Sequence, residues 1–158
     1  MPKVADVGLP SLRQLLVVTT AGAFVSSILG TQTRPSVFPH LLSGCAITLA
    51  ALWTVEIALN KFSDAPPLKI PAIMLAELAG VQLFLGIVAH SMALNARVSA
   101  QPMPGLAVIN ATHAALGALV LAASLFTTFQ AYKYLAPVGA IAAVAHPIEV
   151  EAEVCDPK

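Results

Sequence analysis

Charged residues are scarce in this chain, and that scarcity excludes most soluble proteins. Lysine, arginine, aspartate and glutamate make up 10% of the 158 residues, against about 25% in ordinary soluble domains. Basic and acidic residues are equal in number, so the formal net charge is zero, and we expect no nucleic-acid partner. Aromatic residues are also few, at 6%, which fits a small subunit embedded among other membrane proteins.

Cysteine is nearly absent as well. Cys45 lies inside an apolar run and Cys155 near the end of the chain, and this separation predicts neither a disulfide nor a metal site. The sequence also has no zinc, phosphate or nucleotide motif and no Ser-His-Asp pattern. We therefore assign no catalytic residue, and whether the chain is an enzyme stays open.

Hydrophobic residues make up 58% of the chain, and its mean hydropathy is +0.83. They gather in four long runs, which we expect to be helices at 12–29, 36–60, 71–95 and 106–134, with residue 111 as an alternative start for the last. Runs of about 20 apolar residues are long enough to cross a bilayer as helices. The sequence therefore predicts an all-α fold, an integral membrane four-helix bundle.

The distribution of charge divides the chain into three parts and orients it. We expect an N-terminal segment at 1–11, the transmembrane bundle at 12–135 and an acidic tail at 136–158. The first apolar run follows a basic residue, as in a secretory signal, but we expect it to remain as a transmembrane helix. The side of the termini carries the basic residues Lys3, Arg13, Lys61, Lys69, Lys133 and Lys158, and the other side carries Arg34 and Arg97. By the positive-inside rule, both termini face the cytoplasm, and we expect a multi-pass protein of a bacterial inner membrane.

The two halves of the chain share a pattern, which predicts a two-plus-two tandem repeat. Each half has a helix with an Ala-Gly pair, an arginine after it, a proline-containing segment and a second helix that carries His-x-x-x-Gly. The matched residues are Ala21-Gly22 and Ala79-Gly80, Arg34 and Arg97, and His40 and His113. We therefore expect two equivalent helix pairs in the same orientation.

His40 and His113 are the strongest candidates for a functional site. Each is followed four residues later by a glycine, Gly44 or Gly117, which lies on the same helix face one turn away. A neutral imidazole is a metal ligand, and a pair from two helices can hold a haem iron from both faces. The pattern favours haem b, with the two glycines leaving room for the porphyrin edge. The alternative is that both histidines lie at the membrane surface and are solvated there.

Three other ionisable side chains in the apolar runs have open roles. His90, near the outer end of the third run, fits a substitute ligand, a hydrogen-bond partner of a haem propionate, a quinone contact or a structural residue. Glu56 and Glu77 would form a proton relay or a quinone site if they face the bundle. Otherwise they lie close enough to the cytoplasmic surface to reach water or to bond a neighbouring helix.

Two segments resemble one half of the haem A synthase family. They are 82–87 (Gln-Leu-Phe-Leu-Gly-Ile) and 113–122 (His-Ala-Ala-Leu-Gly-Ala-Leu-Val-Leu-Ala), and the likeness extends over most of 12–134. Members of that family are two tandem four-helix bundles, in which histidines at the outer ends of the second and fourth helices of each half face a haem. His40 and His113 match those positions, so the resemblance implies one haem site in this half-length chain.

The chain also departs from that family. Leu41 follows His40 where the family has a His-Arg pair, and the first outer segment, 31–38, has no acidic residue. Both departures weigh against synthase chemistry. We therefore expect a membrane b-type cytochrome subunit that transfers electrons within a larger respiratory or redox complex.

The expected partners are other membrane subunits of that complex or a second copy of the chain, together with lipid and a quinone. Two alternative functions remain, a haem-modifying enzyme of the haem A synthase type and a haem-free structural transmembrane subunit. The structural alternative differs from the others because it predicts that His40 and His113 tolerate substitution.

Overall fold

A computed structural model describes residues 4–6, 10–31, 38–99 and 105–137 of the chain. Four helices make up nearly all of these residues, and each is long and apolar enough to cross a membrane. They are α1 (Leu12–Thr31), α2 (Phe38–Lys61), α3 (Pro66–Ser99) and α4 (Leu106–Tyr134). The all-α four-helix membrane fold predicted from the sequence is confirmed.

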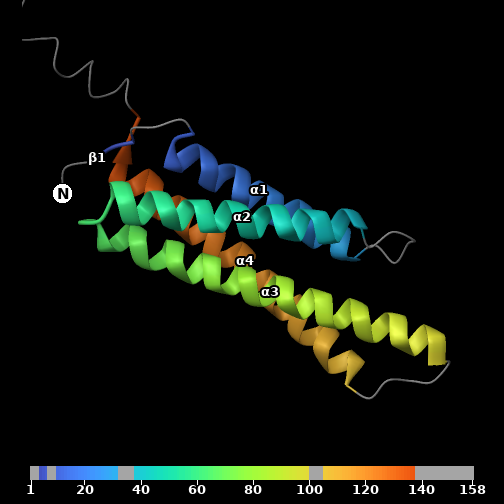
Figure 1. Cartoon of the computed structure of the whole chain (residues 1–158). Coiled ribbons are helices and arrows are strands. Elements are labelled where there is room, and N and C mark those ends of the chain that lie inside the picture. The colour runs from blue at the N-terminus through green and yellow to red at the C-terminus, as the bar shows by residue number, and fades with distance from the viewer. Residues whose placement is uncertain (1–3, 7–9, 32–37, 100–104, 138–158) are drawn as a thin grey trace, which may run out of the picture.

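The four helices form a closed ring (Figure 1). Each packs against the next one in sequence, and α1 also packs against α4. Successive helices run in opposite directions, so α1 is parallel to α3 and α2 is parallel to α4. Helices α2 and α4 therefore lie diagonally across the bundle, where facing side chains can form an internal site.

Helix α3 is longer than expected at both ends, because it covers Pro66–Ser99, 34 residues, instead of 71–95. Its first two residues are prolines, which suit a first turn whose backbone N–H groups have no partner inside the helix. The carbonyl of Ala65 accepts the N–H of Leu68 at 2.9 Å and so starts the helix. Pro71 lies inside α3, and its carbonyl accepts a hydrogen bond from Oγ1 of Thr127 in α4 at 3.3 Å.

Helix α4 begins at Leu106, the first of the two starts that the sequence left open. Gly105 precedes it with a φ of 89°, a left-handed conformation that glycine adopts without strain. Asn110 therefore lies inside α4 and does not cap it. The expected start of the second helix, at residue 36, lies outside the described residues, and so does the acidic tail from residue 138 onward.

The two ends of the described chain meet at one end of the bundle (Figure 1). The short strands β1 (Val4–Ala5) and β2 (Leu135–Ala136) pair in parallel there. Asp6 follows β1, is buried, and accepts hydrogen bonds from the backbone N–H groups of Leu12 at 2.9 Å and Arg13 at 3.1 Å. A carboxylate at this position caps α1 and interacts favourably with the helix dipole.

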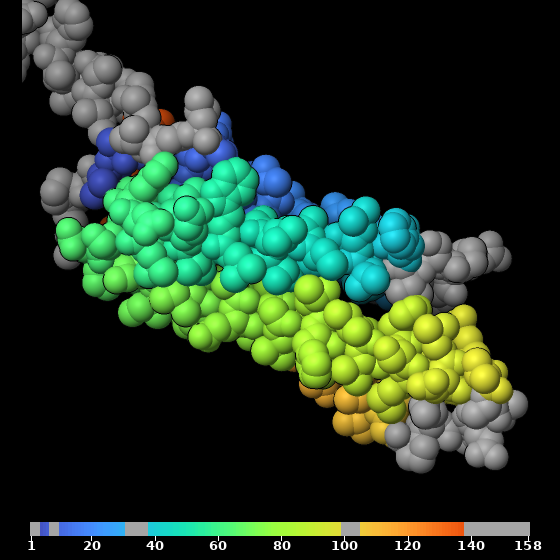
Figure 2. Space-filling model, viewed as in Figure 1, coloured from blue at the N-terminus to red at the C-terminus, as the bar shows by residue number. Residues whose placement is uncertain are grey.

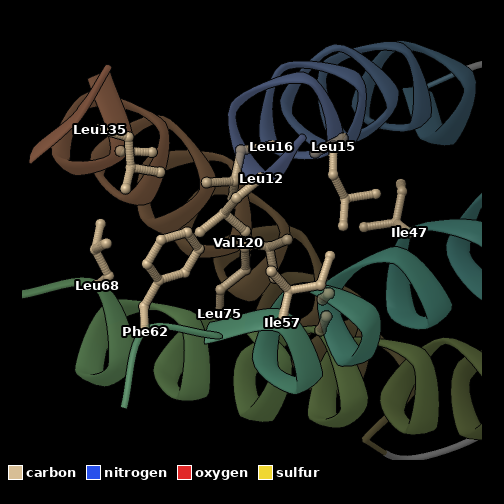
Figure 3. Packing of buried hydrophobic residues seen from close by; sticks show 14 residues of the cluster. Leu12, Leu15, Leu16, Ile47, Ile57, Phe62, Leu68, Leu75, Val120 and Leu135 are labelled. Atoms are coloured by element: carbon tan, nitrogen blue, oxygen red, sulfur yellow. The ribbon is translucent and has the colours of Figure 1, made fainter. Parts of the chain in front are cut away.

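The apolar core gathers at this same end of the bundle. Leucines from α1, α3 and β2 are almost fully buried and face one another there, with Phe62 beside them (Figure 3). We call this region the leucine end and define it by Leu12, Leu16, Leu68, Leu75 and Leu135. Side chains are therefore most deeply buried where the two ends of the described chain meet.

The opposite end of the bundle is packed more loosely. All described side chains at 38–46 in α2 and 105–119 in α4 are half-buried or exposed. Figure 2 shows that the beginning of α2 and the later part of α3 diverge on the face in view. We call this region the histidine end, because His40 and His113 lie in it.

Candidate functional site

His40 and His113 meet across the diagonal of the bundle. Their ring centroids are 5.9 Å apart, and the ring planes are nearly perpendicular, at 85°. His40 is the third residue of α2, whereas His113 lies two turns into α4. Because the two rings nevertheless meet, α4 begins further out than α2 at the histidine end.

The imidazole of His40 is held by α1. Its Nδ1 lies 3.1 Å from the backbone carbonyl oxygen of Ser26 and 3.4 Å from the hydroxyl oxygen of the same residue. A carbonyl only accepts, so Nδ1 of His40 carries the proton and donates it. Among the described residues Nε2 of His40 has no hydrogen-bond partner, so its lone pair is free to bind a ligand.

The imidazole of His113 is held by α3 in a different way. The amide nitrogen of Gln82 lies 3.4 Å from Nε2 of His113. An amide NH2 group only donates, so Nε2 is the acceptor and the ring proton lies on Nδ1. Within the described part of the chain, Nδ1 of His113 and Oε1 of Gln82 are both buried without a hydrogen-bond partner.

A glycine on the preceding helix makes room for each ring. A Cβ atom added to Gly30 in α1 would lie 3.0 Å from Cε1 of His40, and one added to Gly86 in α3 would lie 3.0 Å from Cε1 of His113. Both distances are tighter than ordinary van der Waals contact. Neither these two glycines nor Ser26 had a role at the site predicted from the sequence, because their contacts with the histidines depend on the register between helices.

The two glycines predicted from the His-x-x-x-Gly pattern have different neighbours. A Cβ on Gly117 would lie 3.0 Å from the amide nitrogen of Gln82, whereas a Cβ on Gly44 would meet Leu83 at an ordinary 3.7 Å. Gly117 therefore makes room for the side chain that holds His113. Both glycines are half-buried at the histidine end.

The other candidates lie away from this pair. His90 is half-buried in α3, on the helix face that carries Gln82 and Gly86 but one turn further out. Glu56 and Glu77 are exposed on the outer surface of the bundle. A proton relay or quinone site inside the bundle requires both carboxylates to face inward. They do not, so they form no such site there.

The buried positions of the two helix pairs follow the same spacing. In α2 they include Ile47, Ala51, Thr54 and Ala58, and in α4 they are Val120, Ser124, Thr127 and Ala131. Each residue of the second set comes 73 positions after its counterpart, which is also the separation of His113 from His40. The two histidines therefore occupy equivalent positions relative to the buried faces of their helices.

Helices α1 and α3 match in the same manner. The buried residues Leu12, Leu16, Thr19 and Ala23 have counterparts 56 positions later in Leu68, Ala72, Leu75 and Ala79. The same 56 positions separate Ser26 from Gln82 and Gly30 from Gly86, so each histidine faces a polar residue and a glycine one turn apart. The repeat predicted from the sequence paired Ala21-Gly22 with Ala79-Gly80, which are 58 positions apart. That pairing is two residues away from the 56-residue spacing of the buried positions.

The described residues contain no group of three or more His, Cys, Asp or Glu side chains placed to hold a metal ion. A metal at the histidine end would therefore depend on the His40–His113 pair. Comparison of the chain with protein-family models, curated proteins and solved structures finds no match.

Proposed function

We propose that this chain is a membrane b-type cytochrome subunit in which His40 and His113 are the axial ligands of one haem. The observation that carries the proposal is the approach of these two imidazoles, from diagonally opposed helices, to 5.9 Å between ring centroids. Two imidazoles that share one metal through bonds of about 2 Å each hold their centroids roughly 6 Å apart. When bound, the haem would supply reversible one-electron transfer.

The residues around the pair fit this role. Nδ1 of His40 donates to the Ser26 carbonyl at 3.1 Å, and this kind of hydrogen bond fixes the orientation of a metal-ligating histidine and leaves Nε2 for the metal. Gly30 and Gly86 keep space beside the rings. The loose packing of the histidine end supports a group being inserted there, because a dense core would have to be rebuilt to admit it.

The equivalent spacing of buried residues in the two helix pairs supports a two-plus-two tandem repeat. The resemblance of 82–87 and 113–122 to one half of the haem A synthase family, in which histidines of paired helices face a haem, is the separate sequence argument for the same function. A chain with one such site and no acidic residue at 31–38 suits electron transfer within a larger redox complex better than modification of the haem.

We further propose an inner-membrane location with both termini in the cytoplasm. Lys61, Lys69 and Lys133 lie at the leucine end, and Arg97 lies near the other end of α3, which agrees with the positive-inside rule. Large apolar side chains are exposed on all four helices, among them Val18, Phe24, Leu49, Phe84 and Phe129. Such a surface suits lipid, other membrane subunits or a second copy of the chain.

The proposal is tested by a reduced-minus-oxidised absorption spectrum of the purified protein, with a pyridine haemochrome assay of haem content. Wild-type protein should show a low-spin b-type band, and His40→Ala and His113→Ala should each lose it because one axial ligand is gone. His90→Ala separates ligation from an edge contact, and we expect it to keep the low-spin band and to retain haem less firmly.

A wild-type protein without haem, expressed with the cofactor supplied and shown to be folded by circular dichroism, would contradict the cytochrome function. The structural membrane subunit would then be the better account. Loss of the band in His90→Ala with an unchanged band in His40→Ala would contradict the assignment of the ligands.

A further inference from the structure

Two buried polar atoms without a partner belong to side chains that touch each other. They are Nδ1 of His113, which carries a proton, and Oε1 of Gln82, which can only accept one. Buried polar groups in native proteins are nearly always hydrogen-bonded, and an exception calls for a physical reason. Here the two unsatisfied atoms are a donor and an acceptor, so one hydrogen bond between them would satisfy both.

The equivalent contact in the other half of the bundle shows what that hydrogen bond would do. Nδ1 of His40 donates to the carbonyl of Ser26, and Nε2 has no hydrogen-bond partner within 4–6, 10–31, 38–99 and 105–137. In His113 the arrangement is reversed, because Nε2 is taken by the amide nitrogen of Gln82 and Nδ1 is left over. His40 is therefore ready to bind a metal, whereas His113 must first release Nε2.

We propose that Gln82 is a positioning residue that can hold His113 through either end of its amide. In the arrangement described above, its nitrogen donates to Nε2 of His113. In the occupied site its oxygen would accept a hydrogen bond from Nδ1–H, and Nε2 would be left to hold the iron. No proton is gained or lost, since Nδ1 carries it throughout. The second arrangement rests on the proposed haem function.

Two glycines leave space for the ring and the amide to turn. Gly86 lies beside the ring, since a Cβ there would come within 3.0 Å of Cε1 of His113. Gly117 lies beside the amide, since a Cβ there would come within 3.0 Å of the amide nitrogen of Gln82. Each moving group therefore has a neighbour without a side chain.

The first arm of the test uses haem-loaded protein and compares Gln82→Leu and Gln82→Glu with Ser26→Ala. Loss of a hydrogen-bond partner behind a metal ligand weakens metal binding by roughly 10- to 100-fold, so Gln82→Leu should lower haem affinity by at least tenfold. Gln82→Glu should keep the haem with a lower midpoint potential, because a carboxylate makes the imidazole a stronger electron donor. Ser26→Ala should change neither quantity, because the backbone carbonyl that holds His40 remains.

The second arm uses protein prepared without haem and reads the protonated nitrogen of His113 from imidazole 15N chemical shifts. Wild-type protein should carry the proton on Nδ1. With the ring in the orientation described above, Gln82→Glu should move it to Nε2, because a carboxylate can only accept a hydrogen bond. The tautomer of His40 should be the same in both proteins, since its partner is a backbone carbonyl.

Unchanged haem affinity and potential in both Gln82 variants would overturn the proposed role of Gln82 while leaving the cytochrome function in place. A proton on Nε2 of His113 in the haem-free wild type would overturn it as well. Wild-type protein that never retains haem would instead overturn the proposed function and, with it, the occupied arrangement.

Discussion

The leucine end and the histidine end of the bundle are built from the same four helices but differ in what holds them. At the leucine end, side chains such as Leu16 and Leu75 are completely buried, and two paired strands and a buried carboxylate join the chain ends. At the histidine end, the described side chains at the starts of α2 and α4 are half-buried or exposed, and two polar atoms are buried without partners. In the described part of the chain, the leucine end leaves one buried polar atom without a hydrogen-bond partner, Nε of Arg13, whose guanidinium lies over the ring of Tyr132, whereas the two such atoms at the histidine end are a donor and an acceptor in touching side chains.

This contrast indicates that one end of the bundle stabilises the fold and the other end holds the site. Dense packing fixes the relative positions of the helices, and a site elsewhere can then be left open without loss of the fold. Natural proteins commonly break local rules of packing and hydrogen bonding at functional sites, where a ligand supplies what is missing. The three predictions that follow test whether stability and ligand binding are separated in this way.

The largest effect on stability is expected from Leu75→Ala, because Leu75 is fully buried at the leucine end. Leucine-to-alanine changes in soluble cores cost about 2–5 kcal/mol. In a bilayer the unfolded helices stay in an apolar solvent, so mainly the cavity and the lost packing remain, and we expect about 2 kcal/mol. The free energy of unfolding in mixed micelles measures this change.

The matched variant is Leu83→Ala, from the same helix at the histidine end, where Leu83 is half-buried. Leu83→Ala should lower the free energy of unfolding clearly less than Leu75→Ala does. Equal losses for the two variants would show that packing does not differ between the two ends.

An intermediate effect, on ligand binding more than on stability, is expected from Gly86→Ala. The new Cβ would lie 3.0 Å from Cε1 of His113, and overpacking of about 1 kcal/mol corresponds to roughly fivefold weaker haem binding. Helix propensity favours alanine over glycine by up to about 1 kcal/mol, which offsets this overpacking, so the free energy of unfolding should change little. Haem titration and thermal unfolding separate the two effects.

Gly80→Ala is the control, because no heavy atom lies within 4 Å of a Cβ at that position. It should keep full haem affinity. If Gly86→Ala bound haem as tightly as Gly80→Ala, the ring of His113 would not be confined by α3 as the structure has it.

The smallest effect is expected from Thr127→Val at the leucine end. Oγ1 of Thr127 lies 2.7 Å from the carbonyl oxygen of Ala123 in its own helix and 3.3 Å from that of Pro71 in α3, so its one proton is shared between a bond within α4 and a longer one across the interface. Hydrogen bonds between membrane helices are worth about 0.6 kcal/mol on average, and the free energy of unfolding should fall by at most that amount. The equivalent Thr54 donates to Ala50 of its own helix at 2.9 Å, so Thr54→Val should cost less, and a reversed order would contradict this account.

The fold was predictable because hydropathy and length leave few choices for four apolar runs. The ends of the helices were less predictable, and α3 shows the reason. Pro71 looked like a helix start, but the two prolines before it could occupy the first turn equally well, and only the packing of α3 against α4 decides between them.

The candidate site was predictable only in part. The spacing of His40 and Gly44, and of His113 and Gly117, marks the helices that carry the histidines, because side chains four residues apart share a helix face. The groups that hold the rings, Gln82 and the carbonyl of Ser26, lie on other helices, and their contacts depend on the register between helices. One signal was present, since Ser26 and Gln82 are each followed four residues later by a glycine, in the helix before each histidine.

The strand pair at the leucine end also determines how the two halves of the bundle can move. Residues 62–65 connect α2 to α3 at that end, and β1 and β2 join α1 to α4 at the same end. At the histidine end, by contrast, the chain connects helices only within a half, through 32–37 and 100–104. The chain therefore joins the two halves at the leucine end alone, and a small rotation about that end would change the separation of His40 and His113 more than any distance within the leucine end. A ligand held by both histidines would join the halves at the other end as well, so we expect it to restrict such a rotation.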